Sequence, residues 1–207
     1  MSGDEFKAVA VLLAAGLSRR MGERNKLLIP ISGEPLVRRT AKAYLEAGVA
    51  VHAVLGHEAD LVREALRGFP LTFVQNPNYE EGQPSSVRAG VETLSEGYDA
   101  VLIALGDQAA LTPGDISGLL DAFRHHGGAH IVIPYHGEQR GNPVVFPASL
   151  LAAMRAQGRN AACRAFIDRH PELTRRYEAP NDHFSVDIDT PGDLEAFEAK
   201  HRTNSTA

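Results

Sequence analysis

Short apolar runs alternate with amphipathic stretches along most of the chain. Apolar runs with the length of a buried strand cover residues 8–13, 49–55, 71–75, 99–105, 129–133, 142–146 and 184–188. Apolar residues recur at helical spacing in 35–47, 60–66, 85–94, 149–155 and 160–168, and further helices are predicted to begin at Thr112-Pro113 and Thr190-Pro191. This alternation predicts an α/β fold, with a doubly wound, mostly parallel sheet and right-handed crossovers.

Length and composition are those of one globular domain. The chain has 207 residues, of which 43% are hydrophobic, and we expect a domain over 1–200 followed by a flexible tail over 201–207. The net charge of −5 argues against a dedicated nucleic-acid binder, which usually carries a basic field. No apolar run approaches about 18 residues, so no transmembrane helix is expected. The polar N-terminus has no signal-peptide pattern, which predicts a cytoplasmic protein.

Cysteine and histidine offer little chemistry. Cys163 is the only cysteine, which excludes an intramolecular disulfide and a cysteine-based zinc site. It lies in a predicted helix, where a buried structural thiol is favoured over a nucleophile. The nine histidines show no metal-ligand spacing such as HExxH. The candidate chemistry therefore comes from other residue types.

The loop after the first predicted strand combines small residues with cations. Ala14-Ala15-Gly16 lets the backbone approach a ligand closely, with its N–H groups facing anionic oxygens. Arg19, Arg20 and Lys26 follow and supply the positive charge that a triphosphate needs. The loop is neither a Walker loop nor a GxGxxG fingerprint. Its spacing alone leaves two interpretations open: a phosphate site at a strand end, or a turn with solvated arginines.

Acidic residues follow two other apolar segments. Asp107 comes directly after the strand 99–105, where a carboxylate can hold Mg²⁺; the alternative is a turn residue that caps its own backbone. Alternation along a strand at 184–188 places Asp187 and Asp189 on one face, where their mutual repulsion favours a nearby cation. Capping of the last helix by Asp189 or Thr190 is the alternative there, and it does not explain Asp187.

The segment 82–90 is another candidate. Ser85 and Ser86 stand near a predicted helix start, where hydroxyls and free N–H groups favour an anion or a polar base edge. Ordinary N-capping by either serine is equally compatible with the sequence.

Five strings together resemble MobA-like nucleotidyltransferases, and the resemblance extends over most of the chain. They are Leu13-Ala14-Ala15-Gly16-x-Ser18-x-Arg20-Met21-Gly22 with Asn25-Lys26-Leu27-Leu28, Gly82-Gln83-Pro84-Ser85-Ser86, Gly106-Asp107-Gln108, Arg140-Gly141-Asn142-Pro143-Val144-Val145-Phe146, and Asp187-Ile188-Asp189-Thr190-Pro191. The Ala14-Ala15-Gly16 form looks most like the molybdenum cofactor cytidylyltransferase (MocA-type) branch. The chain departs from the family pattern at Ala109, where proline is common, and at Gln83-Pro84, which replaces Met-Ser.

The resemblance implies a Rossmann-like nucleotidyltransferase fold and assigns roles to residues. It implies catalytic roles for Arg20, Lys26 and Asp107. It implies nucleotide contacts from Leu13, Ala14, Ala15, Gly16, Ser18, Arg19, Met21, Gly22, Ser85, Ser86 and Gly106. It places Arg140, Gly141 and Asn142 on the acceptor side, and it implies that Asp107 holds Mg²⁺ together with Asp187 or Asp189.

The implied reaction moves a nucleotidyl group from an NTP, CTP being favoured, to a phosphorylated acceptor such as molybdopterin. The acceptor phosphate attacks the α-phosphorus and pyrophosphate leaves, so positioning and charge neutralisation carry the catalysis and no general base is needed. A molybdenum hydroxylase is the implied partner. Three alternatives stay open: a sugar or other alcohol phosphate as acceptor, an oxidoreductase using nicotinamide or flavin, and a non-catalytic protein that delivers cofactor.

Overall fold

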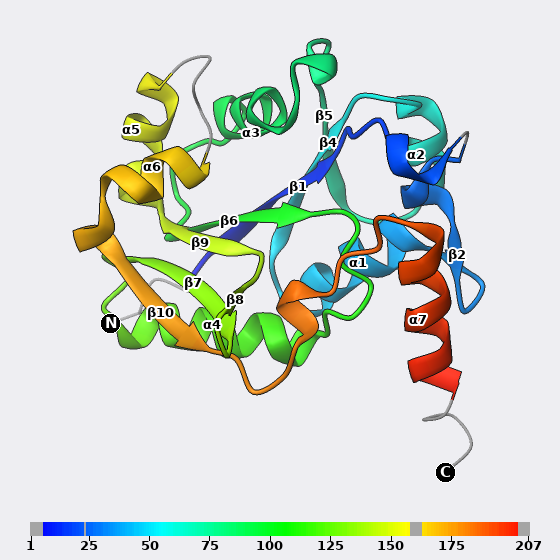
Figure 1. Ribbon diagram of the computed structural model, residues 1–207. Coiled ribbons are helices and arrows are strands. Elements are labelled where there is room, and N and C mark those ends of the chain that lie inside the picture. Colours follow the sequence, from blue (N-terminus) through cyan, green and yellow to red (C-terminus); the bar gives the residue numbers. More distant parts are fainter. Residues whose placement is uncertain (1–5, 23, 158–162, 203–207) are drawn as a thin grey trace.

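The protein is built on one eight-stranded sheet, which the computed structural model describes within residues 6–22, 24–157 and 163–202 (Figure 1). The strand order is β10-β7-β9-β6-β1-β4-β5, with β8 paired to β7. The bounds are β1 Ala8–Ala14, β4 Ala50–Leu55, β5 Leu71–Gln75, β6 Ala100–Leu105, β7 Ile131–His136, β8 Gln139–Arg140, β9 Val144–Pro147 and β10 Thr174–Glu178. A small separate hairpin joins β2 (Pro30–Ile31) to β3 (Glu34–Pro35).

Helices cover both faces of the sheet. They are α1 Leu36–Glu46, α2 Ala59–Ala65, α3 Gln83–Glu92, α4 Pro113–His125, α5 Leu151–Ala156, α6 Cys163–Arg169 and α7 Pro191–Arg202. Buried residues of α1, α2 and α4 form one hydrophobic cluster, and those of α3, α5 and α6 form another. The predicted doubly wound α/β fold is therefore confirmed. None of the described helices is long and apolar enough to cross a membrane.

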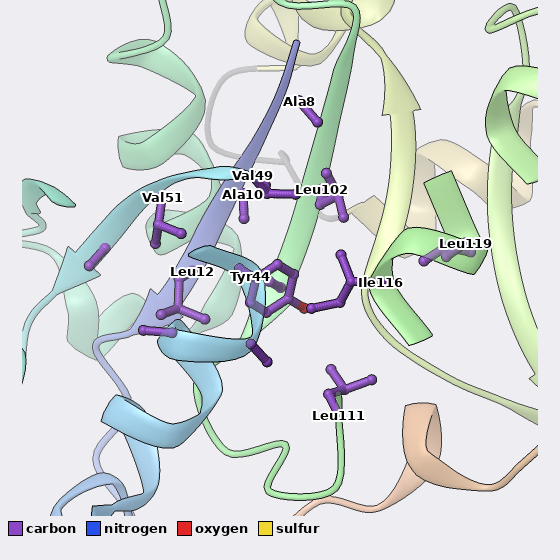
Figure 2. Packing of buried hydrophobic residues seen from close by; sticks show 14 of the residues in the cluster. Ala8, Ala10, Leu12, Tyr44, Val49, Val51, Leu102, Leu111, Ile116 and Leu119 are labelled. Atoms are coloured by element: carbon purple, nitrogen blue, oxygen red, sulfur yellow. The ribbon is translucent and has the colours of Figure 1, made fainter. Parts of the chain in front are cut away.

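Strand β1 lies at the centre because both of its faces are apolar. Ala10 and Leu12 face the cluster of α1 and α4, whereas Val9 and Val11 face that of α3, and all four are fully buried. Figure 2 shows the Tyr44 ring of α1 on the first face, directed toward the side chain of α4 that is labelled Ile116. Continuous apolar strands of this kind are typical of parallel sheets covered on both sides.

Helix α3 lies close to the sheet, and this places its first turn beside the loop that follows β1. A Cβ atom at Gly90 would overlap the side chain of Val11 and lie 2.9 Å from the Val54 Cγ2 atom. Glycine is therefore required where the helix crosses β1 and β4. The close approach fixes the N-terminus of α3 at the carboxyl ends of these strands.

The sheet is mostly parallel, as predicted, with one inserted antiparallel strand. Strand β1 pairs in parallel with both β4 and β6. Strand β9 runs antiparallel to its neighbours β6 and β7, and β10 pairs in parallel with β7 at the edge. Because β1 and β6 are parallel neighbours, their carboxyl ends lie side by side, and the Gly106 N–H donates to the Leu13 carbonyl at 3.0 Å.

The predicted strand over 184–188 is wrong. Residues His183–Ser185 form a 3-10 turn, residues 186–189 join no strand, and β10 holds the sheet edge instead. The apolar alternation there has another cause, because Val186 and Ile188 pack with Ala109, Ala110 and residues of α7. The same pattern missed β10 because this edge strand, Thr-Arg-Arg-Tyr-Glu, is largely polar and no side chain in it is fully buried.

Several predicted boundaries shift by a few residues. Strand β7 begins at Ile131 instead of residue 129, and α3 begins at Gln83 instead of Ser85. Thr112 caps α4 in a capping box with Asp115, as the Thr-Pro signal predicts. Helix α7 runs through Arg202, and residues 203–207 of the predicted tail, like residues 160–162 of the predicted helix 160–168, lie outside the described residues.

Candidate active site

A cavity of about 410 Å³ lies at the carboxyl ends of β1 and β6. The loop after β1 forms one wall, the first turn of α3 forms another, and Asp107 and Asp189 close the floor between them. Nine residues predicted for the site line this cavity: Leu13, Gly16, Ser18, Arg19, Arg20, Lys26, Ser86, Asp107 and Asp189. The crevice beyond parallel strand ends is the usual ligand site of open α/β sheets.

Ser18 and Asn25 shape the loop after β1 through local hydrogen bonds. Ser18 adopts a left-handed conformation with φ 50°, and its Oγ accepts a hydrogen bond from the Lys26 backbone N–H at 3.1 Å. The Asn25 carboxamide oxygen accepts from the Leu27 N–H at 3.1 Å and thereby caps the short helical turn Lys26–Leu28. The two contacts fold the loop back on itself, so the Lys26 side chain points toward the end of β6.

Lys26 connects two carboxylates from distant parts of the sequence. Its ammonium forms a short ion pair with the Asp107 carboxylate and lies 2.6 Å from Asp189 Oδ1. The Lys26 and Asp107 side chains are only 15% and 14% exposed, so solvent screens their interaction little. Burial lowers the pKa of Lys26. The carboxylates of Asp107 and Asp189 together raise this pKa by more, so the net shift is upward. Lys26 is therefore cationic at neutral pH.

Arg20 completes the cluster from the solvent side. Its guanidinium lies 2.8 Å from Asp189 Oδ2, and its side chain is 68% exposed. Asp189 thus accepts from two cations, one shielded and one hydrated. Two cations beside two carboxylates form a balanced group that an incoming phosphate chain or metal ion can reorganise.

Backbone contacts bring the closing Asp-Ile-Asp segment to the end of β6. The Ile188 N–H donates to the Asp107 carbonyl at 3.2 Å, and the buried Ile188 side chain packs in the cluster with Ala109 and Ala110. Thr190 and Asp193 form a reciprocal cap at the start of α7, with the Thr190 N–H 2.7 Å from Asp193 Oδ2. The predicted cap at Thr190 is confirmed, and Asp189 stands just before it, directed at Lys26.

Gln108 holds three segments together beneath the site. It is fully buried, and its amide nitrogen donates to the carbonyls of Asn142 at 3.0 Å and Phe184 at 2.8 Å. From the other side, Thr40 of α1 donates its hydroxyl to the Gly106 carbonyl at 3.2 Å. These contacts fix the turn that carries Asp107. The Gly106-Asp107-Gln108 string was noted in the sequence, but this role of Gln108 depends on partners that are distant in the chain.

Asp187 lies below the cluster and faces a different hollow. It lines a space of about 270 Å³ beside α7, not the main cavity. Burial, followed by the neighbouring carboxylates of Asp107 and Asp189, raises the pKa of Asp187 to about 7. Since no strand contains residues 186–189, strand alternation does not place Asp187 and Asp189 on one face. The two side chains line different spaces, although the carboxylates of Asp107 and Asp189 are close enough to act on the pKa of Asp187.

Two carboxylate oxygens in this region have no hydrogen-bond partner. They are Asp107 Oδ1 and Asp187 Oδ1, both buried. Mg²⁺ takes oxygen ligands and keeps several waters and phosphate oxygens, so two or three carboxylates suffice to hold it. No three His, Cys, Asp or Glu side chains within the described ranges already converge as a metal cluster. The donor set therefore fits a magnesium ion that is bound jointly with a substrate.

The first turn of α3 presents backbone and hydroxyl groups to the same cavity. The N-cap is Gly82, so capping by Ser85 or Ser86 is ruled out as the explanation of these serines. The buried Asn76 amide donates to the hydroxyls of Ser85 at 2.9 Å and Ser86 at 3.0 Å. Ser86 lines the cavity, whereas Ser85 donates to the Gly82 carbonyl at 2.8 Å and stabilises the turn. The helix N-terminus adds positive potential there.

Besides Ser85, five residues predicted for nucleotide contact do not line the cavity: Ala14, Ala15, Met21, Gly22 and Gly106. They shape its wall. Met21 is buried, and a Cβ atom at Gly56 would lie 2.7 Å from the Ala15 Cβ, so Ala15 packs against the end of β4. A Cβ atom at Gly106 would lie 3.0 Å from the Leu13 carbonyl oxygen. Small residues here serve the close packing of the strand ends.

The sequence interpretation gave no role to several other residues of the cavity wall: Leu17, Leu27, Tyr79, Glu80 and Leu105. Gly82 and Gln83, which also line the cavity, lie in the candidate segment 82–90 but had no assigned role. Tyr79 follows the Asn76-Pro77-Asn78 turn at the carboxyl end of β5. That placement was the available signal, because all carboxyl ends of parallel strands meet at one edge.

A second cavity of about 330 Å³ adjoins the first and shares Gln83 and Leu105 with it. Arg140 and Asn142, predicted for the acceptor side, both line it. Gly141 does not, because its backbone turns inward: a Cβ atom there would lie 2.6 Å from the Phe184 Cβ. Gly141, which the resemblance places on the acceptor side, thus packs closely against Phe184 instead.

Comparison with known proteins agrees with this architecture. Residues 10–174 match the family model described as a MobA-like NTP transferase domain. Nicotine blue oxidoreductase of Paenarthrobacter nicotinovorans is 30% identical over 188 residues, which cover 87% of this chain and 91% of that protein. Bifunctional protein GlmU of Allorhizobium ampelinum is 35% identical over 136 residues; these cover 63% of this chain but 29% of GlmU, so the similarity spans under a third of that relative.

Solved structures show the same fold. A nucleotidyl transferase from Methanothermobacter thermautotroptrophicus superposes with a TM-score of 0.81 at 26% identity, covering 96% of this chain and 99% of that chain. CMP:2-keto-3-deoxy-manno-octonic acid synthetase in complex with CTP gives a TM-score of 0.76 at 16% identity, covering 96% of this chain and 99% of the synthetase. The similarity extends over the whole sheet and its helices.

Proposed function

Because the chain belongs to the MobA-like NTP transferase family and is a nucleotidyltransferase, we propose that it transfers CMP from CTP, with Mg²⁺, to a phosphorylated acceptor. The observation that carries the proposal is the contact of Lys26 with both Asp107 and Asp189 in one cavity. Molybdopterin or its molybdenum form is the acceptor to test first, since Ala14-Ala15-Gly16 resembles the cytidylyl branch. A molybdenum hydroxylase as recipient and a cytoplasmic location belong to the same proposal.

The residues of the main cavity divide the work of binding a triphosphate. Lys26 and Arg20 neutralise phosphate oxygens once the nucleotide draws them from Asp107 and Asp189. The N-terminal end of α3, whose helix dipole is positive there, faces the same anion. Ser18 acts indirectly, because its hydroxyl holds the Lys26 backbone in place.

Asp107 and Asp189, with the buried oxygen of Asp187, are the groups that would hold Mg²⁺. When bound, the ion offsets negative charge on the phosphates and orients them. In the transfer, an acceptor phosphate oxygen forms a bond to the α-phosphorus while the bond from that phosphorus to the bridging oxygen breaks and pyrophosphate leaves. The chain contributes position and charge, and the acceptor phosphate needs no proton removed at neutral pH.

A pyrophosphate-release assay tests this function. The purified protein is incubated with one NTP at a time, with and without Mg²⁺ and molybdopterin. We expect release that depends on the acceptor and the metal, fastest with CTP. Release with a sugar phosphate in place of molybdopterin would keep the reaction and change the acceptor, whereas no release with any NTP and either acceptor would overturn the proposal.

An oxidoreductase is the second candidate, and one observation favours it. The relative aligned over 91% of its own length is Nicotine blue oxidoreductase. Reduction of that dye with a nicotinamide or flavin cofactor, measured on the same protein preparation, distinguishes the two activities. Dye reduction without pyrophosphate release would replace the first proposal by the second.

A further inference from the structure

We infer that Arg164 of α6 pairs with Arg140 to form an anion site that selects acceptors with a phosphate on an apolar, unhydroxylated body. The inference rests on the proposed function and specifies its acceptor class. It concerns the second cavity, which has a volume of about 330 Å³, within the range of small-molecule sites. Arg164 was not singled out in the sequence, because it is brought to this cavity from about 70 residues beyond the end of α3.

The charge of this cavity is positive and uncompensated. Arg140 and Arg164 both line it, and none of its lining residues is acidic. Neither arginine has an ion pair or hydrogen bond to any residue in the described part of the chain, whereas Arg155 of the neighbouring α5 donates to the Val91 and Leu94 carbonyls. Two guanidinium groups free of protein partners favour an anion with several oxygens, such as a phosphate.

Cys163 does not supply the missing negative charge. It lines the same cavity, and burial raises the pKa of its thiol to about 12, although the charge of Arg140 acts in the opposite direction. The thiol is therefore neutral at physiological pH and belongs to the apolar part of the wall. The anion has to come from a ligand.

The remaining wall is mostly apolar. Pro84, Val87, Ile103, Leu105 and Val144 line it, and Gln83 and Asn142 are the polar residues besides the arginines. A sugar phosphate would bring several hydroxyls against a wall in which five side chains offer no hydrogen bonds, and each hydroxyl buried there without a partner is unfavourable. A flat or apolar body gains from the same contacts.

The position of the cavity suits an acceptor. Gln83 and Leu105 border both cavities, so a ligand held here lies next to a nucleotide held by the loop after β1. Close placement of two reactants is the main contribution that a protein can make to such a transfer.

The test uses 1-naphthyl phosphate, a fluorescent phosphate ester with an apolar body, and measures its binding to the intact protein by fluorescence titration. We expect Arg164→Ala and Arg140→Ala each to weaken binding by about tenfold or more, and Arg164→Lys to weaken it less. Arg169→Ala is the matched control on the same helix. The Arg169 guanidinium donates hydrogen bonds to the Ala165 carbonyl and the Gln157 side-chain oxygen, and Arg169 does not line the cavity. 1-Naphthol and ribose 5-phosphate are expected to bind at least about tenfold more weakly.

Two results would overturn the inference. One is wild-type affinity for 1-naphthyl phosphate in folded Arg164→Ala, verified by circular dichroism; the other is equal affinity of the wild type for ribose 5-phosphate. CTP binding, measured in parallel, separates this inference from the proposed function. If the protein binds CTP and releases pyrophosphate but shows no binding of 1-naphthyl phosphate, the arginine site alone is refuted. A protein that binds 1-naphthyl phosphate but releases no pyrophosphate with any NTP refutes the nucleotidyl transfer alone.

Discussion

The two adjoining cavities differ in whether their cationic side chains form ion pairs within the protein. In the first, Lys26 and Arg20 are already paired with the carboxylates of Asp107 and Asp189. In the second, Arg140 and Arg164 have no charged partner among the described residues. The cavities share two wall residues, so this difference arises within a short distance.

The contrast indicates how each ligand must bind. Under the proposed function, we expect a triphosphate entering the first cavity to draw Lys26 from Asp107, and the freed carboxylates would then require another cation, such as the proposed Mg²⁺. We therefore expect the binding of nucleotide and of metal to be coupled through Lys26. An anion entering the second cavity replaces only water and breaks no ion pair. The acceptor is expected to bind independently of metal.

The largest effect should follow from removing the carboxylate that anchors the first cavity. Asp107→Asn leaves Lys26 one neutral partner and takes one ligand from the metal, so we expect pyrophosphate release to fall by about 10²- to 10³-fold. Asp182→Asn, which changes an exposed aspartate paired with Lys200, is the control. Activity of Asp107→Asn within tenfold of the wild type would contradict the assignment.

Lys26→Ala tests the coupling itself. We expect CTP to bind about tenfold or more weakly, because a shielded cation is lost. In the absence of nucleotide, however, Mn²⁺ should bind more tightly than to the wild type, because no ammonium competes for Asp107 and Asp189. Mn²⁺ binding is followed by electron paramagnetic resonance, and Lys26→Arg serves as the charge-conserving control. A loss of Mn²⁺ affinity in Lys26→Ala would show that lysine and metal do not compete.

The pKa of Asp187 predicts how the metal-free protein responds to pH. In the folded protein it is raised to about 7 from 3.8, so the folded state holds a proton that the unfolded state has released between these values. The free energy of unfolding should therefore fall as the pH rises from 4 to 7. Asp187→Asn should remove this trend and add about 2 kcal/mol at pH 8, a value reduced from the full shift because the side chain is partly exposed.

Urea unfolding in EDTA at pH 5 and pH 8 measures this effect. Mg²⁺ should then restore stability to the wild type at pH 8, and it should stabilise Asp187→Asn less, since the metal binds the ionised carboxylate. Identical pH profiles for the two proteins would show that Asp187 is not the group responsible.

The smallest effect is expected at the solvent side of the first cavity. Arg20→Ala should change the free energy of unfolding by less than about 0.5 kcal/mol, because exposed ion pairs contribute little. It should weaken CTP binding by a few-fold at low salt, and the difference should shrink at high salt as screening increases. A large loss of stability would mean that Arg20 has a structural role in the loop that its contact with Asp189 does not explain.

Much of the fold follows from patterns within single segments. The run from Ala8 to Leu13 predicts a buried strand, and Thr112-Pro113 predicts the start of α4, because the signals are local and each is satisfied within one turn or strand. The strand predicted at 184–188 failed for the opposite reason. Ile188 is buried by Ala109 and α7, which are distant in sequence, and a buried residue has the same identity whether a sheet or a loop packs on it.

The site shows the same division. The loop after β1 and the Gly106-Asp107-Gln108 turn can be located from the sequence, since a strand followed by small, cationic or acidic residues marks the edge where ligands bind. The sequence does not reveal that Gln108 ties the Asp107 turn to the carbonyls of Asn142 and Phe184, nor that Tyr79 borders the same cavity. These facts depend on which strands become neighbours.

By itself, the sequence determined most of the elements, the family and the two ends of the Lys26–Asp107 contact, because these depend on composition and spacing over short stretches. Only the tertiary structure decided that Lys26 reaches Asp107 and Asp189, that Asp187 faces another hollow, and that Arg164 joins Arg140. The physical reason is that charge interactions depend on distance in space, and pairing of strands far apart in the chain sets that distance.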